Sequence, residues 1–386
     1  MRQPAPATLA PFTVLAIMLC AAALASATTH DLGLGIEVQG SGVQPQIFFA
    51  CCDQGIAAMQ SLFADPAIIS DLKGLNAILA FAVPDLSPER AQTVRQLNAA
   101  GIPLFAWVEL SKEQGTYLNA DNEPQAAEAF ANFENWSAQY GLQWQGVGLD
   151  IEPDFSQLAS LREHKWRLAY LLAERYIDTV RVYRAREAYG HLIRKLQLRG
   201  YIVQTYQMPL IVADRRAHIT LFERLFGVVD VRGDEEVLML YSSFVPSLGA
   251  GMIWSLAPGE QAIAIGNTQA DPNAGANGVP LHWDEFSRDL LVASHFSRIA
   301  GVYNLEGCVQ QGFLTRLRTM NWNQSVLIPA DSIRKANRMR RLVSTLLWIG
   351  AILPVIIVIA IFLLAGSIWR WRRHRRRAKY ILSEVG

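Results

Sequence analysis

Two acidic residues stand two positions apart in the apolar run GVGLDIE, residues 146–152, which Pro153 follows. The run has the length and composition of a buried β-strand, and alternate side chains of a strand point to the same side. The carboxylates of Asp150 and Glu152 should therefore reach each other, because their Cα atoms lie roughly 6.6 Å apart at about 3.3 Å per residue. Two buried carboxylates this close cannot both ionise easily, so one should keep its proton and serve as a general acid near neutral pH.

A purely structural role for the same pair is the alternative. Asp150 and Glu152 would then accept hydrogen bonds from the backbone or from arginine side chains at the end of a strand. Pro153 would end the strand, because proline has no N–H to donate to a neighbouring strand.

Eight short β-rich runs alternate with longer helix-patterned segments from about residue 44 onward, which is typical of βα units around a parallel sheet. The runs cover residues 46–50, 75–83, 102–110, 146–152, 201–206, 237–242, 261–267 and 299–304. Eight such units predict an α/β fold of the (β/α)8 TIM-barrel type. An open doubly wound sheet is less favoured, since the chain has no glycine-rich phosphate loop. Residues 159–200 are too long for one ordinary helix, so we expect an extended or doubled helix there.

Catalytic groups of such barrels lie at the carboxyl ends of the strands, and several runs end near aromatic or acidic residues. Aromatic rings provide flat apolar platforms with polar edges on which a ligand can stack, although core or helix packing is the alternative for each ring. The candidate substrate-binding residues are Trp107, Glu109, Tyr206, Trp254, Trp283, Tyr303 and Glu306. A second catalytic carboxylate, if one is needed from another strand end, would be Asp53, Asp85, Glu109 or Glu306.

The run GVGLDIEP resembles the fourth-strand signature DxxDxDxE of glycoside hydrolase family 18, the chitinase-like (β/α)8 enzymes. Its last two acidic positions correspond to Asp150 and Glu152, whereas its first two correspond to Gln145 and Gly148. The resemblance implies that Glu152 donates a proton to the glycosidic oxygen. It also implies that Asp150 orients a substrate acetamido group, which acts as the internal nucleophile.

A second stretch, Met239-Leu240-Tyr241-Ser242, resembles the Met-x-Tyr-Asp motif on the sixth strand of the same family. The resemblance implies that Tyr241 holds the acetamido oxygen. Ser242 stands in place of the motif's Asp, and the tryptophan that the family has at the end of strand 8 is missing here, where the chain has Tyr303.

Charge and composition exclude some classes of partner. The 386 residues carry a net charge of +1, but residues 28–341 hold 27 Lys+Arg against 33 Asp+Glu. A mildly acidic central part lacks the basic surface that nucleic acid binding needs. No CxxC pair, HExxH motif or histidine-rich tract occurs, so we expect neither a metal nor another cofactor.

The two ends of the chain predict export and membrane anchoring. Residues 1–27 combine Arg2, an apolar run and the sequence Ala25-Ser26-Ala27, which is typical of a signal peptide; an uncleaved anchor is the alternative. Residues 342–369 carry no charge and exceed the roughly 20 residues that cross a bilayer, which predicts a transmembrane helix. We thus expect a signal peptide (1–27), a linker (28–43), the barrel (44–325), a juxtamembrane linker (326–341), the transmembrane helix (342–369) and a basic cytoplasmic tail (370–386). The protein would lie in the plasma membrane with a single pass, its N-terminal domain outside, and the tail could contact membrane lipid.

Export also bears on the cysteines. Removal of the signal peptide would leave Cys51, Cys52 and Cys308 in an oxidising compartment. Barrel closure places the last strand beside the first, so we expect a disulfide between Cys308 and either Cys51 or Cys52.

The leading hypothesis is a membrane-anchored extracytoplasmic glycoside hydrolase that acts on an amino-sugar-containing polysaccharide, with Glu152 as general acid. The alternative is a catalytically inactive barrel that binds glycan or protein as a receptor or scaffold. An enzyme needs Glu152 beside Asp150 at the bottom of a cleft that solvent can reach. A scaffold can bury Glu152 or pair it with arginine.

Overall fold

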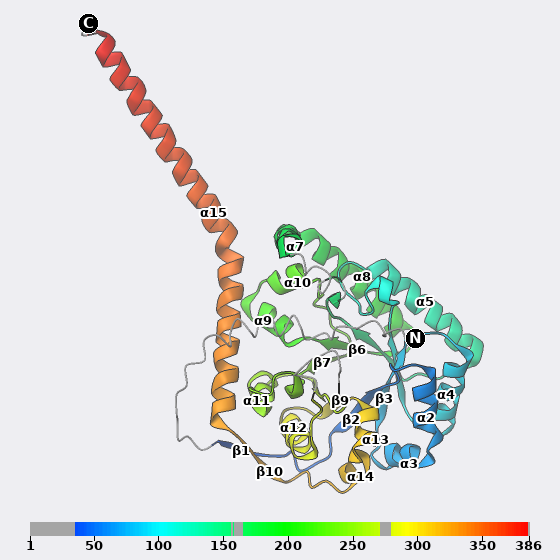
Figure 1. Cartoon of the computed structure of the whole chain (residues 1–386). Helices are drawn as coiled ribbons and strands as arrows, with labels where there is room; N and C mark the ends of the chain where they lie inside the picture. The colour runs from blue at the N-terminus through cyan, green and yellow to red at the C-terminus, as the bar shows by residue number, and fades with distance from the viewer. Residues whose placement is uncertain (1–34, 156, 158–164, 271–278, 385–386) are drawn as a thin grey trace, which may run out of the picture.

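A computed structural model describes residues 35–155, 157, 165–270 and 279–384 (Figure 1). The expected signal peptide, residues 1–27, lies outside these residues. So does much of the glycine-rich segment that follows the seventh barrel strand.

The centre of the molecule is a closed barrel of eight parallel strands. The strands are β2 (Gln46–Cys51), β3 (Ile78–Val83), β4 (Leu104–Val108), β5 (Gly146–Asp150), β6 (Ile202–Gln207), β7 (Glu235–Met239), β8 (Ala262–Gly266) and β9 (Ile299–Tyr303). Each strand pairs with the next, and β9 closes on β2, with Phe48 opposite Gly301. The predicted α/β TIM barrel is confirmed, and each of the eight predicted runs overlaps one strand.

Helices surround the barrel. They are α2 (Ile56–Ala64), α3 (Pro66–Gly74), α4 (Pro88–Ala99), α5 (Glu123–Tyr140), α7 (Lys165–Ile177), α8 (Thr179–Leu198), α9 (Pro209–Ala217), α10 (Leu221–Phe226), α11 (Ala250–Leu256), α12 (Trp283–Phe296), α13 (Leu305–Gln310) and α14 (Phe313–Arg318). The doubled helix expected before β6 is present as α7 and α8. They separate at Asp178, whose side chain accepts a hydrogen bond from the backbone N–H of Arg181 and so caps α8.

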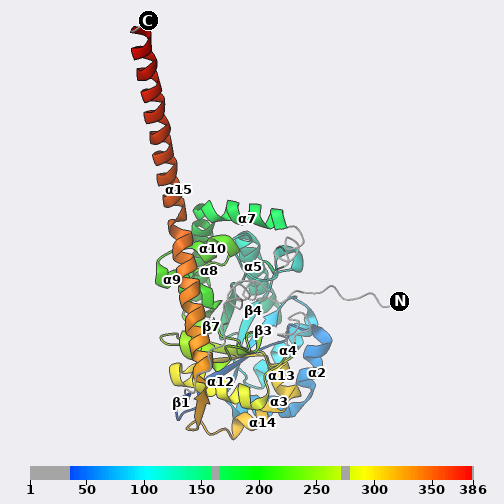
Figure 2. The same ribbon diagram turned by 60° about the vertical axis from the view of Figure 1, so that its left-hand side comes forward.

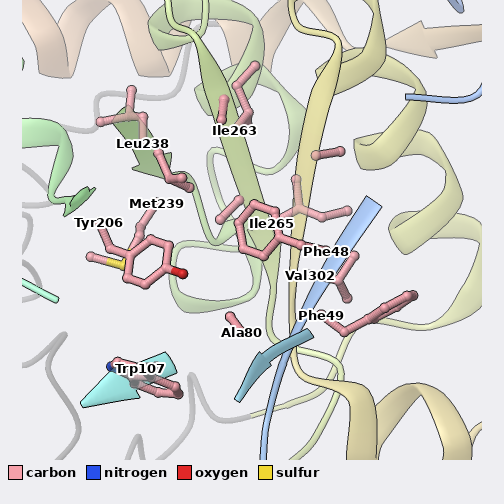
Figure 3. Packing of buried hydrophobic residues seen from close by; sticks show 14 of the residues in the cluster. Phe48, Phe49, Ala80, Trp107, Tyr206, Leu238, Met239, Ile263, Ile265 and Val302 are labelled. Carbon is pink, nitrogen blue, oxygen red and sulfur yellow. The ribbon is translucent and has the colours of Figure 1, made fainter. Parts of the chain in front are cut away.

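Large side chains cross the interior of the barrel where a neighbouring strand carries glycine. The ring of Phe48 lies against Gly301, and a Cβ on this glycine would be only 2.3 Å from the ring. Tyr206 stacks on Phe48 with ring centroids 6.1 Å apart. Figure 3 shows Phe48, Tyr206 and Trp107, which come from three different strands, around the same part of the interior. The glycines in the strands therefore make room for aromatic rings inside the barrel.

Two segments expected as linkers contain regular structure. Strand β1 (Ile36–Gln39), within residues 28–43, pairs antiparallel with β10 (Ser325–Ile328), which ends within residues 326–341. This small sheet lies at the end of the barrel where the parallel strands begin, since His295, near the end of the helix that precedes β9, lies 3.1 Å from the carbonyl oxygen of Gln39 in β1.

The chain ends in a long helix, α15 (Ala330–Glu384). Its first part packs along the barrel, with Ser332 and Ile333 directly against Gly251 of α11, and its second part extends beyond the barrel (Figures 1 and 2). Within the described residues, no single helix has both the length and the apolar composition needed to cross a membrane. One pair of segments, Ala330–Leu353 and Val358–Arg372, meets that test jointly, with a bend of 40° between them.

Candidate active site

Strand β5 places the two acidic residues of the predicted pair at the carboxyl end of the barrel. Asp150 is its last residue, and the chain continues extended because Leu118 bridges Ile151. The N–H of Leu118 donates to the carbonyl of Asp150 at 2.9 Å, and the N–H of Glu152 donates to the carbonyl of Leu118 at 3.1 Å. Strand geometry thus continues through Glu152, and both carboxylates line the same pocket.

The pocket is open at the carboxyl end of the barrel and encloses about 640 Å³, including the part open to solvent. The enclosed space that water-sized molecules can occupy is much smaller, about 60 Å³. Half of the residues that line the pocket are aromatic, and the lining comes from the barrel strands and from the segments that follow β4, β5 and β7. The polar and aromatic lining residues are Phe48, Trp107, Tyr117, Asp150, Glu152, Tyr206, Tyr241, Phe244 and Tyr303.

Burial governs the protonation of the acidic pair. Asp150 is 5% exposed and Glu152 is 3% exposed. Burial raises the pKa of Asp150 to about 7. The nearby Trp107 indole N–H acts in the opposite direction and lowers this pKa, although it forms no hydrogen bond of standard geometry. Burial and the charge of Asp150 raise the pKa of Glu152 well above its usual value. The site can therefore hold one proton at neutral pH, and Glu152 is the residue that holds it.

No arginine or lysine pairs with this acidic pair among the residues that the structure describes. Asp150 Oδ1 and Glu152 Oε2 are buried without a hydrogen-bond partner there. A strand end stabilised by arginine would have satisfied both oxygens. The absence of a basic partner argues against a strand end stabilised by arginine, whereas the burial of both carboxylates is a feature expected of a scaffold.

The aromatic residues form a continuous wall. Tyr241 stacks on Tyr303 with ring centroids 5.7 Å apart, and Trp107 meets Tyr303 edge to face at 6.4 Å. Burial and the charges of Asp150 and Glu152 raise the pKa of Tyr241. The Tyr241 hydroxyl therefore stays protonated and near both carboxylates, where it can donate a hydrogen bond to a substrate.

Further acidic residues lie beside the pocket. Burial and the charges of Asp53 and Asp150 raise the pKa of Glu109, at the end of β4, to about 8. Burial and the charge of Asp53 raise the pKa of Glu306 to about 7, and Glu306 accepts a hydrogen bond from the N–H of Cys52 at 2.7 Å. The Tyr303 hydroxyl donates a hydrogen bond to Asp53 Oδ2, with 3.0 Å between the two oxygen atoms. Neither Glu109 nor Glu306 lines the pocket: Glu109 lies near Asp53 and Asp150, and Glu306 lies near Asp53 and Cys52.

Asp85, the remaining candidate for a second carboxylate, has a structural role. The fully buried Arg90 bonds Asp85 Oδ2 at 3.0 Å. The same guanidinium donates to the carbonyl oxygens of Ala82 and Cys52 at 2.8 and 3.1 Å. Arg90 thus ties the ends of β2 and β3 together, and Asp85 is held away from the pocket.

Besides Glu109 and Glu306, two further predicted substrate-binding residues do not reach the pocket. Trp254, in α11, packs on Phe296 and His295 with centroid distances of 5.2 and 5.8 Å. Trp283, the first residue of α12, packs on Phe313 at 5.3 Å. Both prediction errors have the same cause, because these residues lie in helices outside the barrel rather than at strand ends.

Tyr117 is a lining residue that the sequence analysis missed. It follows the short 3-10 helix η1 (Lys112–Gln114), and the bridge between Leu118 and Ile151 holds it beside the acidic pair. Burial and the charges of Glu152, Asp150, Glu109 and Asp53 raise its pKa. The only signal in the sequence is an aromatic residue next to Gly115 and Thr116, which does not by itself indicate a site.

The expected disulfide is not formed. Cys51, Cys52 and Cys308 are all buried and free. Cys52 and Cys51 face each other, with their sulfur atoms 2.7 Å apart, whereas Cys308 interacts with the Thr268 side chain. Barrel closure does bring the segment of Cys308 close to Cys52, since Glu306 bonds the Cys52 amide. The thiol directions, however, do not match a bond between Cys308 and either partner.

The described residues contain no group of three or more His, Cys, Asp or Glu side chains arranged to hold a metal ion. The lining of the pocket offers carboxyl, phenol and indole groups to a ligand.

Comparisons with known proteins give distant structural neighbours only. No family model and no curated protein matches the chain. Among solved structures, the chain is similar to the PgaB (BpsB) glycoside hydrolase domain from Bordetella bronchiseptica, with 12% identity, a TM-score of 0.46, and coverage of 72% of this chain and 98% of that one. A chitinase from Chromobacterium violaceum gives 12% identity, a TM-score of 0.39, and coverage of 70% and 99%. A D-allulose 3-epimerase from Methylomonas sp. gives 10% identity, a TM-score of 0.38, and coverage of 81% and 100%. All three scores are below 0.5, so the function has to be inferred from the residues of the site.

Proposed function

We propose that the chain is a membrane-anchored, extracytoplasmic glycoside hydrolase that acts on an amino-sugar-containing polysaccharide. The observation that carries the proposal is the pair Asp150 and Glu152, buried without basic partners at the bottom of an aromatic pocket. A protonated Glu152 is a general acid for the glycosidic oxygen, and the aromatic wall offers stacking surfaces for sugar rings.

The reaction follows from the roles that the family 18 resemblance implies. Glu152 gives its proton to the leaving glycosidic oxygen while the acetamido oxygen of the sugar being cleaved attacks the anomeric carbon of that same sugar, so the glycosidic bond breaks as a cyclic intermediate forms. Asp150 accepts the acetamido N–H, and Tyr241 donates to the acetamido oxygen. The Glu152 carboxylate then takes a proton from a water molecule whose oxygen attacks the anomeric carbon. This attack opens the cyclic intermediate, and the proton restores Glu152 as the acid.

The anchoring part of the proposal depends on α15. Side chains such as Val355, Phe362 and Leu363 are apolar and exposed on the part of the helix that extends beyond the barrel. Because Leu347 and Gly350 pack against the barrel, a bilayer would surround the later part of the expected span 342–369 and cover these side chains, and the tail from Arg370 onward would lie on the cytoplasmic side. Residues 1–27 would direct the barrel to the opposite side.

The decisive experiment is hydrolysis of chromogenic N-acetylglucosamine oligomers by the full chain in detergent micelles, with Glu152→Gln alongside. We expect the variant to lose between about a hundredfold and ten-thousandfold in kcat, the usual contribution of a general acid. Glu128→Gln, on the exposed side of α5, is the matched control and should retain activity. A wild-type chain that is folded and cleaves no glycan would refute the proposal.

The inactive receptor remains the second candidate because of one observation. Gly148 stands where the family 18 signature has an acidic residue, and the Tyr206 ring fills the space beside it. A receptor would bind glycan equally well in the wild-type form and in the Glu152→Gln variant, and would turn over none of it. Measuring binding and hydrolysis on the same pair of proteins separates the two functions.

A further inference from the structure

Helix α7 exposes an apolar face to its surroundings. Trp166, Tyr170, Ala173 and Ile177 recur at steps of four, three and four residues, which places them along one side of the helix. Trp166 is 70% exposed, Tyr170 69% and Ile177 75%. The opposite side is held by the barrel, because Arg175 is buried and bonds Asp121 at 2.7 Å. The helix thus docks by the side that carries Leu168, Arg175 and Tyr176, and it leaves a second apolar side uncovered.

The same surface continues into α8. Val180 is 75% exposed and Tyr183 67%. We call the surface of Trp166, Tyr170, Ala173, Ile177, Val180 and Tyr183 the α7 face. An arginine flanks it, since the Arg167 guanidinium lies 5.2 Å from the ring of Trp166. Tryptophan and tyrosine with a flanking cation are typical of a helix that lies in the headgroup region of a bilayer.

A second observation indicates what covers this face. The hydroxyl of Tyr176, in α7, donates to the carbonyl of Gly350 in α15. Gly350 also lies against α10, where a Cβ would be 2.3 Å from Leu221 Cδ2. Beyond this contact α15 leaves the barrel with exposed apolar side chains, and Figures 1 and 2 show α7 at the level where it does so. Whatever surrounds the extended part of α15 must therefore also adjoin α7.

We propose that the α7 face lies in the interface of the bilayer that α15 enters, so that the barrel rests on the membrane by this face. The inference rests on the proposed membrane anchor and adds a second, peripheral contact. The charge and composition of the α7 face suit lipid headgroups and the outer ends of acyl chains.

The contact would also orient the catalytic pocket. Helix α7 lies between the carboxyl end of β5, which carries Asp150, and α8, which returns to the start of β6. The α7 face is thus at the same end of the barrel as the pocket. A barrel that rests on this face turns its pocket end toward the membrane, so its substrate would be a glycan chain at the membrane surface.

The test uses the full chain reconstituted in vesicles of phosphatidylethanolamine and phosphatidylglycerol that contain a doxyl-labelled lipid as quencher. A bimane label is placed at Ala173→Cys in the α7 face, at Phe362→Cys in α15, or at Leu327→Cys in β10. Leu327 is exposed, at 59%, and belongs to the small sheet at the other end of the barrel. Cys20 is replaced by serine in every variant, and the other native thiols, at 51, 52 and 308, are buried, which limits their labelling.

We expect quenching at residue 173 at least twofold stronger than at residue 327, together with strong quenching at residue 362. Quenching at 362 with no excess at 173 over 327 would overturn the inference and leave the anchor intact. Absence of quenching at both 362 and 173 would refute the anchor and the inference together. Quenching at 173 alone would support the α7 face as a lipid contact and refute the transmembrane span.

Discussion

The ring of Tyr206 fills the space beside Gly148. A Cβ on Gly148 would lie 2.6 Å from Tyr206 Cε2 and 2.8 Å from the Tyr206 hydroxyl oxygen, which donates to Gln204 Oε1 at 2.9 Å. The family 18 signature has a carboxylate at the position of Gly148. In this barrel a buried phenol takes that place, and the charge of Asp150 contributes to the raised pKa of Tyr206.

Restoring the acidic position should therefore destabilise the protein. Gly148→Asp forces a side chain into the Tyr206 ring and buries a charge without a partner. Overpacking alone typically costs about 1–3 kcal/mol, and burial of the carboxylate adds to this. Urea unfolding of the full chain in micelles measures the change in the free energy of unfolding.

Two further variants isolate the cause. Gly148→Ala adds only a Cβ and should lose less stability than Gly148→Asp. Combining Gly148→Asp with Tyr206→Ala removes the obstructing ring, so the double variant should be more stable than the sum of the two single changes implies. Equal stability of Gly148→Asp and wild type would show that the ring can move aside.

Activity should depend on pH through the acidic pair. The proposed mechanism needs Asp150 ionised and Glu152 protonated. The pKa of Asp150 is raised to about 7 and that of Glu152 well above its usual value, so kcat/KM should rise as pH approaches about 7 and fall again at higher pH. A profile measured from pH 5 to 10 on a chromogenic oligomer tests both limbs.

Asp150→Asn provides the check on this assignment. It removes the charge that raises the pKa of Glu152, so the alkaline limb should move to lower pH, whatever the loss of kcat. An alkaline limb that stays in place would assign it to another group.

Stability should fall as the medium becomes alkaline. The pKa of Glu109 is raised to about 8 in the folded protein, so the folded state binds a proton that the unfolded chain releases near pH 4 to 5. Its contribution is fully present below the unfolded pKa and is lost as pH rises through about 8, with a total on the order of 2–4 kcal/mol. Glu109→Gln should flatten the decline in the free energy of unfolding between pH 5 and 9. Glu128→Gln should not; an equal slope in both variants would contradict the assignment.

The eight strands and the acidic pair could be predicted from the sequence because both follow from local periodicity. Alternation over two residues places Asp150 and Glu152 on one side, and the barrel rule places them at the carboxyl end. Tyr117 could not be found in this way, since its position depends on the pairing of Leu118 with Ile151, far apart along the chain.

The direction of side chains outside the strands could not be predicted from the sequence either. Proximity in sequence to a strand end does not show whether a tryptophan lies in a helix, which is where Trp254 and Trp283 are found. The cysteine prediction used the neighbouring positions of β2 and β9 correctly. It could not foresee that Cys52 adopts a left-handed conformation, with φ of 77°, at the end of β2.

A comparison of Trp107 with Trp254 supplies a final prediction, which distinguishes a pocket residue from a packing residue. Trp107 lines the pocket beside Asp150 and contacts Tyr303, so Trp107→Ala removes a stacking surface and should raise KM for oligosaccharide at least tenfold. Trp254→Ala removes packing against Phe296 at a comparable cost in stability, about 3–5 kcal/mol for a well-packed tryptophan, but should leave KM of the folded enzyme unchanged. Both variants are assayed at a temperature where circular dichroism shows them folded. A similar rise of KM in Trp254→Ala would mean that the pocket extends beyond the strand ends to α11.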